Sequence, residues 1–199
     1  VDSSILPTYY WMGVSFETLG DHQQAIKWWN LHVQKSIEKE AMTKSTTYIR
    51  EYYDMGASLN NLERFEEAEE AFRRFLALDS IDVYGWYGLG FSLYRQGKFD
   101  LAISAMERSI SLYPKFLEGL IVIGAILRDQ NRFSDSEKYW LKVVEIDSAN
   151  VNPWNEIGLV KLKIFQYKEA AKISRKVIGM DPLNAIAWNN LGLALLQLH

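Results

Sequence analysis

Hydrophobic and polar residues follow a helical period in two neighbouring stretches between Val83 and Pro114. In the first stretch, the residues on one side of a 3.6-residue helical wheel are Trp86, Leu89, Gly90 and Leu93. In the second stretch, the corresponding residues are Phe99, Ala102, Ile103, Met106 and Ile110. A short polar turn, Gln96-Gly97-Lys98, separates the two stretches. The pattern predicts two amphipathic helices that pack together as an antiparallel hairpin.

This pattern recurs along the chain at a fixed spacing. One glycine marks each copy, at Gly13, Gly56, Gly90, Gly124, Gly158 and Gly192; the first interval is 43 residues and the other four are 34. A small residue follows twelve positions later, at Ala25, Ala68, Ala102, Ser136 and Ala170. A ring stands three positions before each small residue, at His22, Phe65, Phe99, Phe133 and Tyr167. The three sets of residues keep the same spacing relative to one another, which indicates repeats. The small residues allow two helix backbones to approach closely.

Trp86-x2-Leu89-Gly90, followed by Ala102 and then Pro114, is similar to the pattern W-x2-L-G…A-x3-F…P of the tetratricopeptide repeat (TPR) family. The resemblance covers nearly every residue of the chain. It implies an all-α fold, a right-handed TPR superhelix (α-solenoid) of five helix-turn-helix hairpins plus a sixth first helix. It also implies that the first helices line the concave side and that the protein holds a partner there.

The repeats predict a single domain over residues 1–199. We expect units at about 6–48, 49–82, 83–116, 117–150 and 151–184, with a partial unit at 185–199. The nine extra residues of the first unit are expected to lengthen its second helix through residues 36–40. Because the chain begins with Val1 rather than Met, we expect a piece of a longer polypeptide.

The fifth unit departs from the pattern. Lys161 stands where other units have Leu or Phe, and Ser174 stands where a large side chain such as Trp140 is expected. A lysine on a packing face has to extend to solvent or lose its charge. We therefore expect this hairpin to be the weakest.

Composition and charge exclude several classes of function. Net charge is −3, from 22 basic and 25 acidic residues, which does not suit nucleic acid or an anionic membrane surface. The longest mostly apolar run, 116–127, is shorter than the roughly 20 residues of a membrane-spanning helix. Cysteine is absent, which excludes disulfides and thiolate metal sites and favours a cytoplasmic location.

No arrangement of residue types in the sequence indicates catalysis. The three histidines, His22, His32 and His199, are scattered. The glycines of Gly85-x-x-Gly88-x-Gly90 lie inside a repeat and lack the preceding strand of a dinucleotide-binding motif. We therefore expect no enzyme activity, no cofactor and no bound metal.

The first helices carry an unusual number of apolar and aromatic residues on the side away from the hairpin partner, where a surface helix is normally polar. Gly88 lies among these rings and is expected to leave a notch that admits a ligand side chain. These side chains either pack on neighbouring first helices or form a groove for an apolar or aromatic peptide. The candidate groove residues are Tyr53, Tyr84, Tyr87, Gly88, Phe91, Tyr94, Arg95, Ile121, Arg128 and Asn155.

Two TPR subfamilies can be tested at these positions. Co-chaperones that hold acidic chaperone tails resemble one another in a clamp of basic and Asn residues, whereas this chain has Tyr10, Val14, Asp54, Tyr84 and Gly88 there. The TPR arm of the O-linked N-acetylglucosamine transferase has an asparagine ladder. Here that row reads Trp11, Asp54, Gly88, Val122, Glu156 and Asn190, so one rung matches. Neither subfamily fits.

The last helical stretch exposes a second apolar face, made of Ile186, Leu193 and Leu196. A terminal helix of a solenoid is normally polar outside. Three functions therefore remain open: a scaffold that binds a peptide or helix of a partner protein in the concave groove, a module that forms homo-oligomers through the C-terminal helix, and a regulatory arm of an enzyme encoded elsewhere in the same chain.

Overall fold

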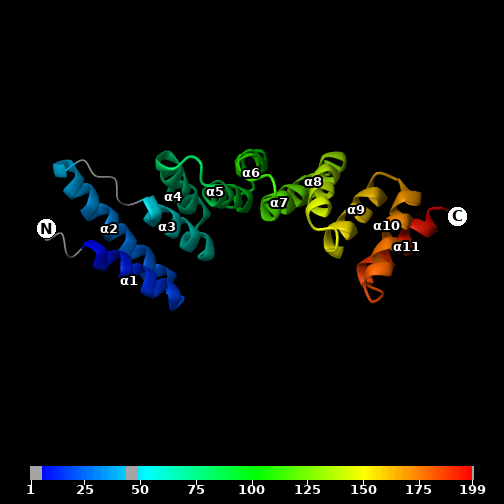
Figure 1. The fold of residues 1–199 in the computed structure, drawn as a ribbon, viewed down its shortest axis with the longest axis horizontal. Helices are drawn as coiled ribbons and strands as arrows, with labels where there is room; N and C mark the ends of the chain where they lie inside the picture. The colour runs from blue at the N-terminus through cyan, green and yellow to red at the C-terminus, as the bar shows by residue number, and fades with distance from the viewer. Residues whose placement is uncertain (1–5, 44–48, 199) are drawn as a thin grey trace. The chain divides into compact units, whose positions relative to one another are not determined.

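The computed structural model describes residues 6–43 and 49–198, which form eleven α-helices and no strand (Figure 1). The helices are α1 (Leu6–Thr18), α2 (His22–Thr43), α3 (Ile49–Asn61), α4 (Phe65–Leu78), α5 (Val83–Arg95), α6 (Phe99–Leu112), α7 (Leu117–Asp129), α8 (Phe133–Ile146), α9 (Val151–Lys163), α10 (Tyr167–Met180) and α11 (Ala185–Leu196). The all-α prediction is confirmed.

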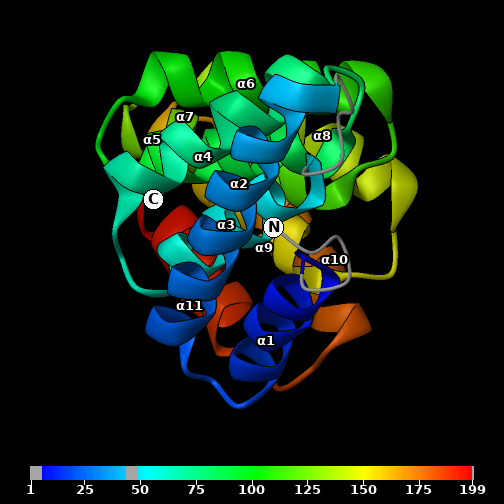
Figure 2. The same cartoon turned by 90° about the vertical axis from the view of Figure 1, so that its left-hand side faces the viewer.

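Each pair of consecutive helices packs as a hairpin, from α1 with α2 to α9 with α10, and α11 is the sixth first helix. Figures 1 and 2 both show α1 and α2 side by side. The predicted five hairpins plus one helix are therefore confirmed. The helices group into two compact units, one within Val1–Leu112 that contains α1 to α6 and one within Tyr113–His199 that contains α7 to α11.

One large side chain from the second helix covers the glycine of the first helix in most hairpins. It stands sixteen residues after the glycine, as Trp29, Phe72, Met106 and Trp140. A Cβ atom at Gly13 would lie 2.3 Å from Nε1 of Trp29, and one at Gly124 would lie 2.8 Å from Cε2 of Trp140. The glycines are thus needed because the ring lies directly on the helix backbone.

The fifth hairpin lacks this large side chain, as the sequence indicated. Ser174 takes its place, is buried, and donates its hydroxyl hydrogen to the Ala170 carbonyl at 2.9 Å. The atoms nearest to a Cβ at Gly158 would be Nδ2 of Asn190 and Cγ2 of Ile173, both at 3.6 Å. This glycine is in ordinary contact with its neighbours, so the hairpin is less tightly packed there than the others.

Lys161 forms an ion pair inside the repeat array. Its Nζ lies 2.8 Å from Oε1 of Glu137 on α8 and donates to Oε1 of Gln166 at 2.7 Å. Both charged side chains are mostly buried, with 16% and 18% exposed. The lysine therefore joins the fourth and fifth repeats by an ion pair, a partner that the hydrophobic pattern did not reveal.

Similar polar contacts fix how the first helices α5, α9 and α11 begin. The indole Nε1 of Trp86 donates to the Ser80 carbonyl at 2.9 Å, and Trp188 donates to the Pro182 carbonyl at the same distance. The Asp82 side chain accepts from the backbone N–H of Gly85 at 2.6 Å, which satisfies a free donor at the start of α5. Each such contact ties the loop from the preceding repeat to the new helix.

The second helix of the first repeat is longer than its counterparts, with 22 residues in α2 against 14 in α4. The expected extension of this helix is confirmed. Over the residues described, none of the helices combines the length and the apolar character that crossing a membrane requires.

Candidate functional site

The candidate site lies on the first helices, at the position three residues before each glycine. This position is occupied by Tyr10, Tyr53, Tyr87, Ile121, Asn155 and Asn189 in successive repeats. We call the surface of the first helices around this row the groove face, and describe it separately in each compact unit.

At the start of the first unit, α1 and α3 enclose a small pocket of about 250 Å³ that Tyr10, Trp29 and Asp54 help to line. The Tyr10 hydroxyl donates to Oδ2 of Asp54 at 3.4 Å, and the Arg50 Nε donates to Oδ1 at 3.1 Å. Burial raises the pKa of Asp54 above its ordinary value, although Arg50 and the Tyr10 hydroxyl act in the opposite direction. These polar groups satisfy one another.

The predicted notch at Gly88 does not exist. Gly88 is buried, and the Phe72 ring of the preceding hairpin fills the space beside it, with Cε1 at 2.5 Å from the position of a Cβ atom. Tyr53 packs edge-on against the same ring, with ring centroids 5.8 Å apart. Gly88 is therefore a packing position between two repeats, and it offers no opening to a ligand.

Other groove residues of α5 contact rings of their own unit. The Arg95 guanidinium lies 4.4 Å from the Phe65 ring centroid and 5.8 Å from that of Phe91, and its Nη2 is 3.2 Å from Oε1 of Glu63. The Tyr94 ring is tilted against Phe99 at 6.1 Å. These two side chains thus pack on rings of the second helices α4 and α6, whereas the sequence suggested either packing on neighbouring first helices or an open groove.

Tyr84 and Tyr87 complete the aromatic set on α5. Tyr84 is exposed, whereas Tyr87 is half-buried, as is Phe91 one turn further on. Exposed aromatic surface therefore remains on the groove face of the first unit, although the pocket expected beside Gly88 is absent.

A larger pocket lies on the groove face of the second unit. It has a volume of about 390 Å³ and is surrounded by residues of three first helices, α7, α9 and α11. Three of its residues were candidates from the sequence: Ile121 and Ile186, which are exposed, and Asn155, which is buried. Leu159, Asn190 and the Trp140 ring also line it. Asn190 is the matching asparagine of the row considered from the sequence, and Leu159 stands one helical turn after Asn155 on the same side of α9.

One ion pair stands beside this pocket. The Arg128 Nη1 lies 2.5 Å from Oε2 of Glu156, which lines the pocket, and the Arg128 Nη2 lies 2.9 Å from Oδ1 of Asp129. Arg128 was one of the candidate groove residues from the sequence. The structure pairs its guanidinium with two carboxylates.

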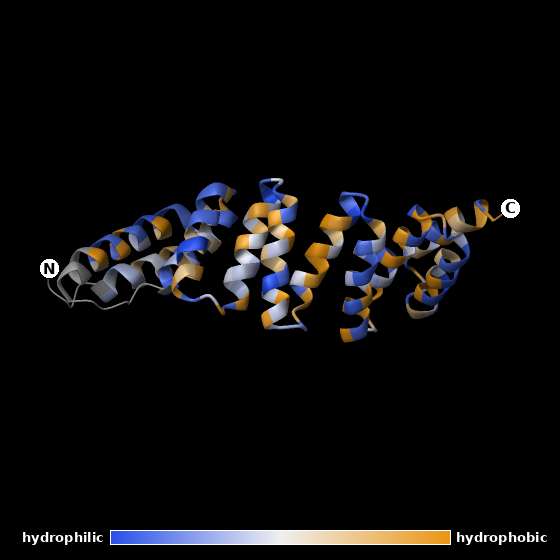
Figure 3. Cartoon of the chain, turned by 90° about the horizontal axis from the view of Figure 1, so that it is seen from above, coloured by the Kyte–Doolittle hydropathy of each residue, from blue (hydrophilic) through white to orange (hydrophobic). Residues whose placement is uncertain are grey.

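The proposed oligomer contact and the groove share one set of repeat positions. Ile186, Leu193 and Leu196 stand three 34-residue repeats after Tyr84, Phe91 and Tyr94. Ile186 lines the pocket, while Leu193 and Leu196 are exposed further along α11. Figure 3 shows hydrophobic residues on the helix next to the C-terminal label.

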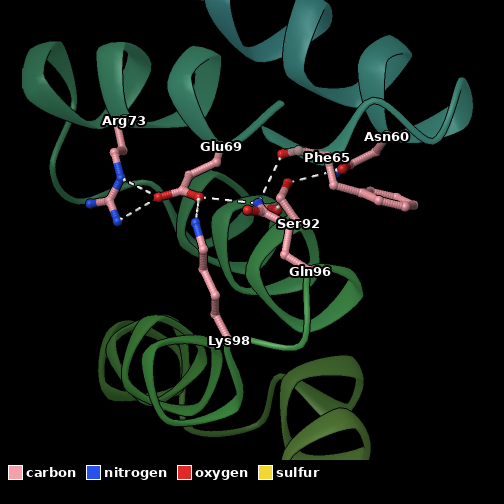
Figure 4. Close-up of polar contacts among 8 residues, drawn as sticks. Asn60, Phe65, Glu69, Arg73, Ser92, Gln96 and Lys98 are labelled. Atoms are coloured by element: carbon pink, nitrogen blue, oxygen red, sulfur yellow. Dashed lines mark hydrogen bonds and ion pairs between the residues drawn. The ribbon is translucent and has the colours of Figure 1, made fainter. Parts of the chain in front are cut away.

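Polar contacts also connect successive repeats on the side of the second helices. Glu69 of α4 accepts from Lys98 at 2.9 Å and from Gln96 at 3.1 Å, and Arg73 lies 2.8 Å away (Figure 4). Burial alone would raise the Glu69 pKa, but these hydrogen bonds outweigh it and hold the pKa below its ordinary value. This cluster stabilises the stacking of the second and third repeats.

One group of side chains contains the residue types of a catalytic triad. The Ser58 hydroxyl donates to Oε2 of Glu17 at 2.6 Å, and Nδ1 of His22 lies 2.8 Å from the same oxygen. A serine nucleophile needs a base positioned to take its proton. Here the histidine and the hydroxyl both contact the carboxylate, and Ser58 is fully buried. Within the part of the chain that the structure describes, no cluster of three His, Asp or Glu residues could hold a metal ion.

Comparison with known proteins agrees with this architecture. A family model described as "Tetratricopeptide repeat" matches residues 53–115, 92–151 and 155–198. A search of curated proteins found no match.

Several solved structures have a similar fold. A MamA crystal structure has a TM-score of 0.79 and 19% sequence identity, covering 90% of this chain and 93% of its own. YrrB, described as a TPR protein with an unusual peptide-binding site, has a TM-score of 0.73 and 17% identity. The match covers 91% of this chain and 89% of YrrB. A tetratricopeptide repeat protein from Parabacteroides merdae has a TM-score of 0.82 and 13% identity, with 98% and 74% covered. At these identities the similarity concerns the fold.

Proposed function

The chain belongs to the tetratricopeptide repeat family, and from this premise we propose that it is a non-catalytic scaffold that holds a peptide or helix of a partner protein on its groove face. The observation that carries the proposal is the pocket of about 390 Å³ that α7, α9 and α11 form together. A ligand seated there touches three repeats at once.

The dimensions of this surface suit a short segment of a partner. Of the three first helices, α9 and α11 pack together, and packed helices lie roughly 8–10 Å apart. An extended peptide rises about 3.3 Å per residue, so about three residues bridge these two helices. Ile121 and Ile186 supply exposed apolar surface on the outer two of the three helices, where the side chains of such a segment find contacts.

A displayed library of random peptides, selected on the whole chain, tests the proposal. Ile121→Glu places a charge in the pocket and should weaken the selected peptides at least tenfold, because apolar anchors carry most of the energy of such interfaces. The matched control is Leu141→Glu, an apolar position on the second helix α8 that is also exposed. Peptides that bind Ile121→Glu normally, or that lose binding to the control instead, would contradict groove binding.

Self-association is the second candidate function. Leu193 and Leu196 are exposed on α11, and Gly192 has no atom of another element within 4 Å of where its Cβ would be. A second copy of the chain that packs on this surface would cover apolar area that the described residues leave open. The mass of the protein as a function of concentration separates this function from peptide binding.

A further inference from the structure

The groove pocket of the second unit contains a buried polar atom that the fold does not satisfy. The Asn155 side chain is 5% exposed and lines the pocket. Its Nδ2 donates to Oδ1 of Asn184 at 3.0 Å. Its Oδ1 receives no hydrogen bond from the described residues. Buried amide oxygens nearly always have a partner, so this one points to a function.

The orientation of the Asn155 amide is determined by its neighbours. The backbone N–H of Ala187 donates to Oδ1 of Asn184 at 3.0 Å, so this atom is an acceptor. Asn184 uses its own Nδ2 for Asp181, donating to Oδ2 at 3.1 Å. Asn155 must therefore turn its NH₂ group toward Asn184. The free atom of Asn155 is consequently the carbonyl oxygen, which requires a donor from outside.

The surroundings of this oxygen are mainly apolar. Ile121, Leu159 and Ile186 line the pocket from the three first helices. The Trp140 ring also lines it, and its indole Nε1 is likewise buried without an acceptor among the residues described. A ligand group that enters the pocket is thus placed against apolar side chains, with Asn155 among the residues that it meets.

The charged groups beside the pocket are already paired with one another. Glu156 is a lining residue, but its carboxylate is paired with Arg128 at 2.5 Å. A carboxylate on the ligand would meet the Asn155 oxygen, which cannot donate to it. A cation would have to compete with Arg128 for Glu156. The pocket therefore favours a neutral group.

We infer that this pocket selects a peptide side chain with an apolar body and a neutral hydrogen-bond donor at its end, as in tyrosine and tryptophan. The inference rests on the proposed function and specifies the ligand of the same site. The donor satisfies Oδ1 of Asn155, and the body packs on Ile121, Leu159 and Ile186. Phenylalanine and leucine fill the pocket but leave the oxygen unsatisfied, which costs affinity in a buried site.

The test uses the displayed random peptide library on the whole chain, sequenced after selection. The wild-type chain should enrich tyrosine or tryptophan over phenylalanine at one peptide position, with at least a fivefold preference. Asn155→Leu removes the acceptor and should abolish that preference, so that phenylalanine binds equally well. Asn155→Asp keeps an acceptor and adds a charge, so it should shift the preference toward lysine or arginine.

The matched control is Asn30→Leu, the same substitution at an exposed position of the second helix α2. It should keep the wild-type preference. If peptides lose binding to Ile121→Glu yet show the same preference with wild type, Asn155→Leu and Asn155→Asp, the inference is wrong and groove binding stands. If the library yields no peptide that depends on Ile121, both proposals are overturned. Circular dichroism of each variant establishes that it is folded. If Asn155→Leu does not fold, the peptide preference of Asn155→Asp decides whether the inference holds.

Discussion

The ring of Phe72 in the second repeat occupies the space beside Gly88 in the third, so that a Cβ atom at Gly88 would lie 2.4 Å from Cζ of Phe72. The same ring lies 2.8 Å from the Cβ position of Gly56, in its own hairpin. One phenylalanine therefore lies against two first helices. Gly56 and Gly88, on the successive first helices α3 and α5, leave space for this ring.

Gly88→Ala should destabilise the protein. In a helix interior alanine is favoured over glycine by about 1 kcal/mol. Here the added methyl collides with a buried ring, and overpacking of this kind typically costs about 1–3 kcal/mol. Urea unfolding followed by circular dichroism measures the sum of the two effects.

The control for Gly88→Ala is Gly192→Ala. Gly192 is also inside a helix, α11, but nothing lies within 4 Å of its Cβ position, so this variant should gain up to about 1 kcal/mol. The double variant Gly88→Ala with Phe72→Leu should lose less stability than the sum of the two single variants. The smaller leucine leaves space for the methyl group that alanine adds. Equal stability of Gly88→Ala and Gly192→Ala would contradict the packing described here.

Lys161→Leu should also destabilise the protein, although the hydrophobic pattern of the repeat favours leucine at this position. The substitution leaves the mostly buried carboxylate of Glu137 without its cation. Removing one partner of such a pair costs on the order of 1–3 kcal/mol, which exceeds the gain from an apolar side chain that replaces a lysine stem. The free energy of unfolding from urea titration reports the result.

An exposed ion pair on α8 provides the comparison for Lys161. Lys138 lies 2.9 Å from Oδ1 of Asp135, and both side chains are accessible to solvent. Lys138→Leu should change stability by less than about 0.5 kcal/mol. Restored stability in Lys161→Leu with Glu137→Leu would show that the uncompensated carboxylate is the cause. A rise in stability for Lys161→Leu alone would reject the argument.

The contribution of Glu69 should depend on pH. Its folded-state pKa lies below the ordinary value of 4.5, because the hydrogen bonds from Lys98, Arg73 and Gln96 outweigh the effect of burial. The ionised carboxylate therefore favours the folded state. This stabilisation is fully present above the unfolded pKa and is lost as pH falls through the lower folded pKa.

Comparing the wild type with Glu69→Gln as a function of pH isolates this effect. The wild type should be more stable by about 1 kcal/mol above roughly pH 6, where the carboxylate is ionised. The difference should shrink below the ordinary pKa of 4.5. Glu66→Gln, at an exposed position of the same helix, serves as the control. A difference that stays constant from pH 7 to about pH 3 would exclude a role for the Glu69 charge.

The repeat architecture could be predicted because its signal is local and periodic. Gly124 and Trp140 stand sixteen residues apart within one hairpin, and their contact follows from two helices and a short turn. The series of glycines, small residues and rings repeats this relation with one phase. Packing within a hairpin is therefore readable from the sequence.

Contacts between repeats were less accessible from the sequence. Gly88 shows that a side chain is missing, but not that Phe72 from the preceding repeat fills the space. Lys161 breaks the apolar pattern, but its partner Glu137 lies on another hairpin. The free oxygen of Asn155 is equally invisible, because it depends on the orientation that Asn184 imposes. These contacts depend on how one hairpin stacks on the next. A helical wheel describes a single helix and therefore does not show them.

The exposed leucines of α11 provide the test of self-association. Leu193 and Leu196 are 46% and 74% exposed, at the positions where α5 carries Phe91 and Tyr94. If a second copy covers them, the average mass by light scattering should rise with concentration toward the millimolar range. Leu193→Glu with Leu196→Lys should remain monomeric, because burying the new charges in an interface is unfavourable.

The control for α11 replaces two exposed leucines on second helices, Leu101→Glu on α6 and Leu141→Lys on α8. This variant loses the same number of exposed leucines and gains the same charges. Non-specific hydrophobic association would therefore fall equally in both variants. Association that persists in the control but disappears in the α11 variant assigns the contact to Leu193 and Leu196. A wild-type chain that stays monomeric across the range removes self-association as a function of this face, and peptide binding in the groove is then the remaining proposal.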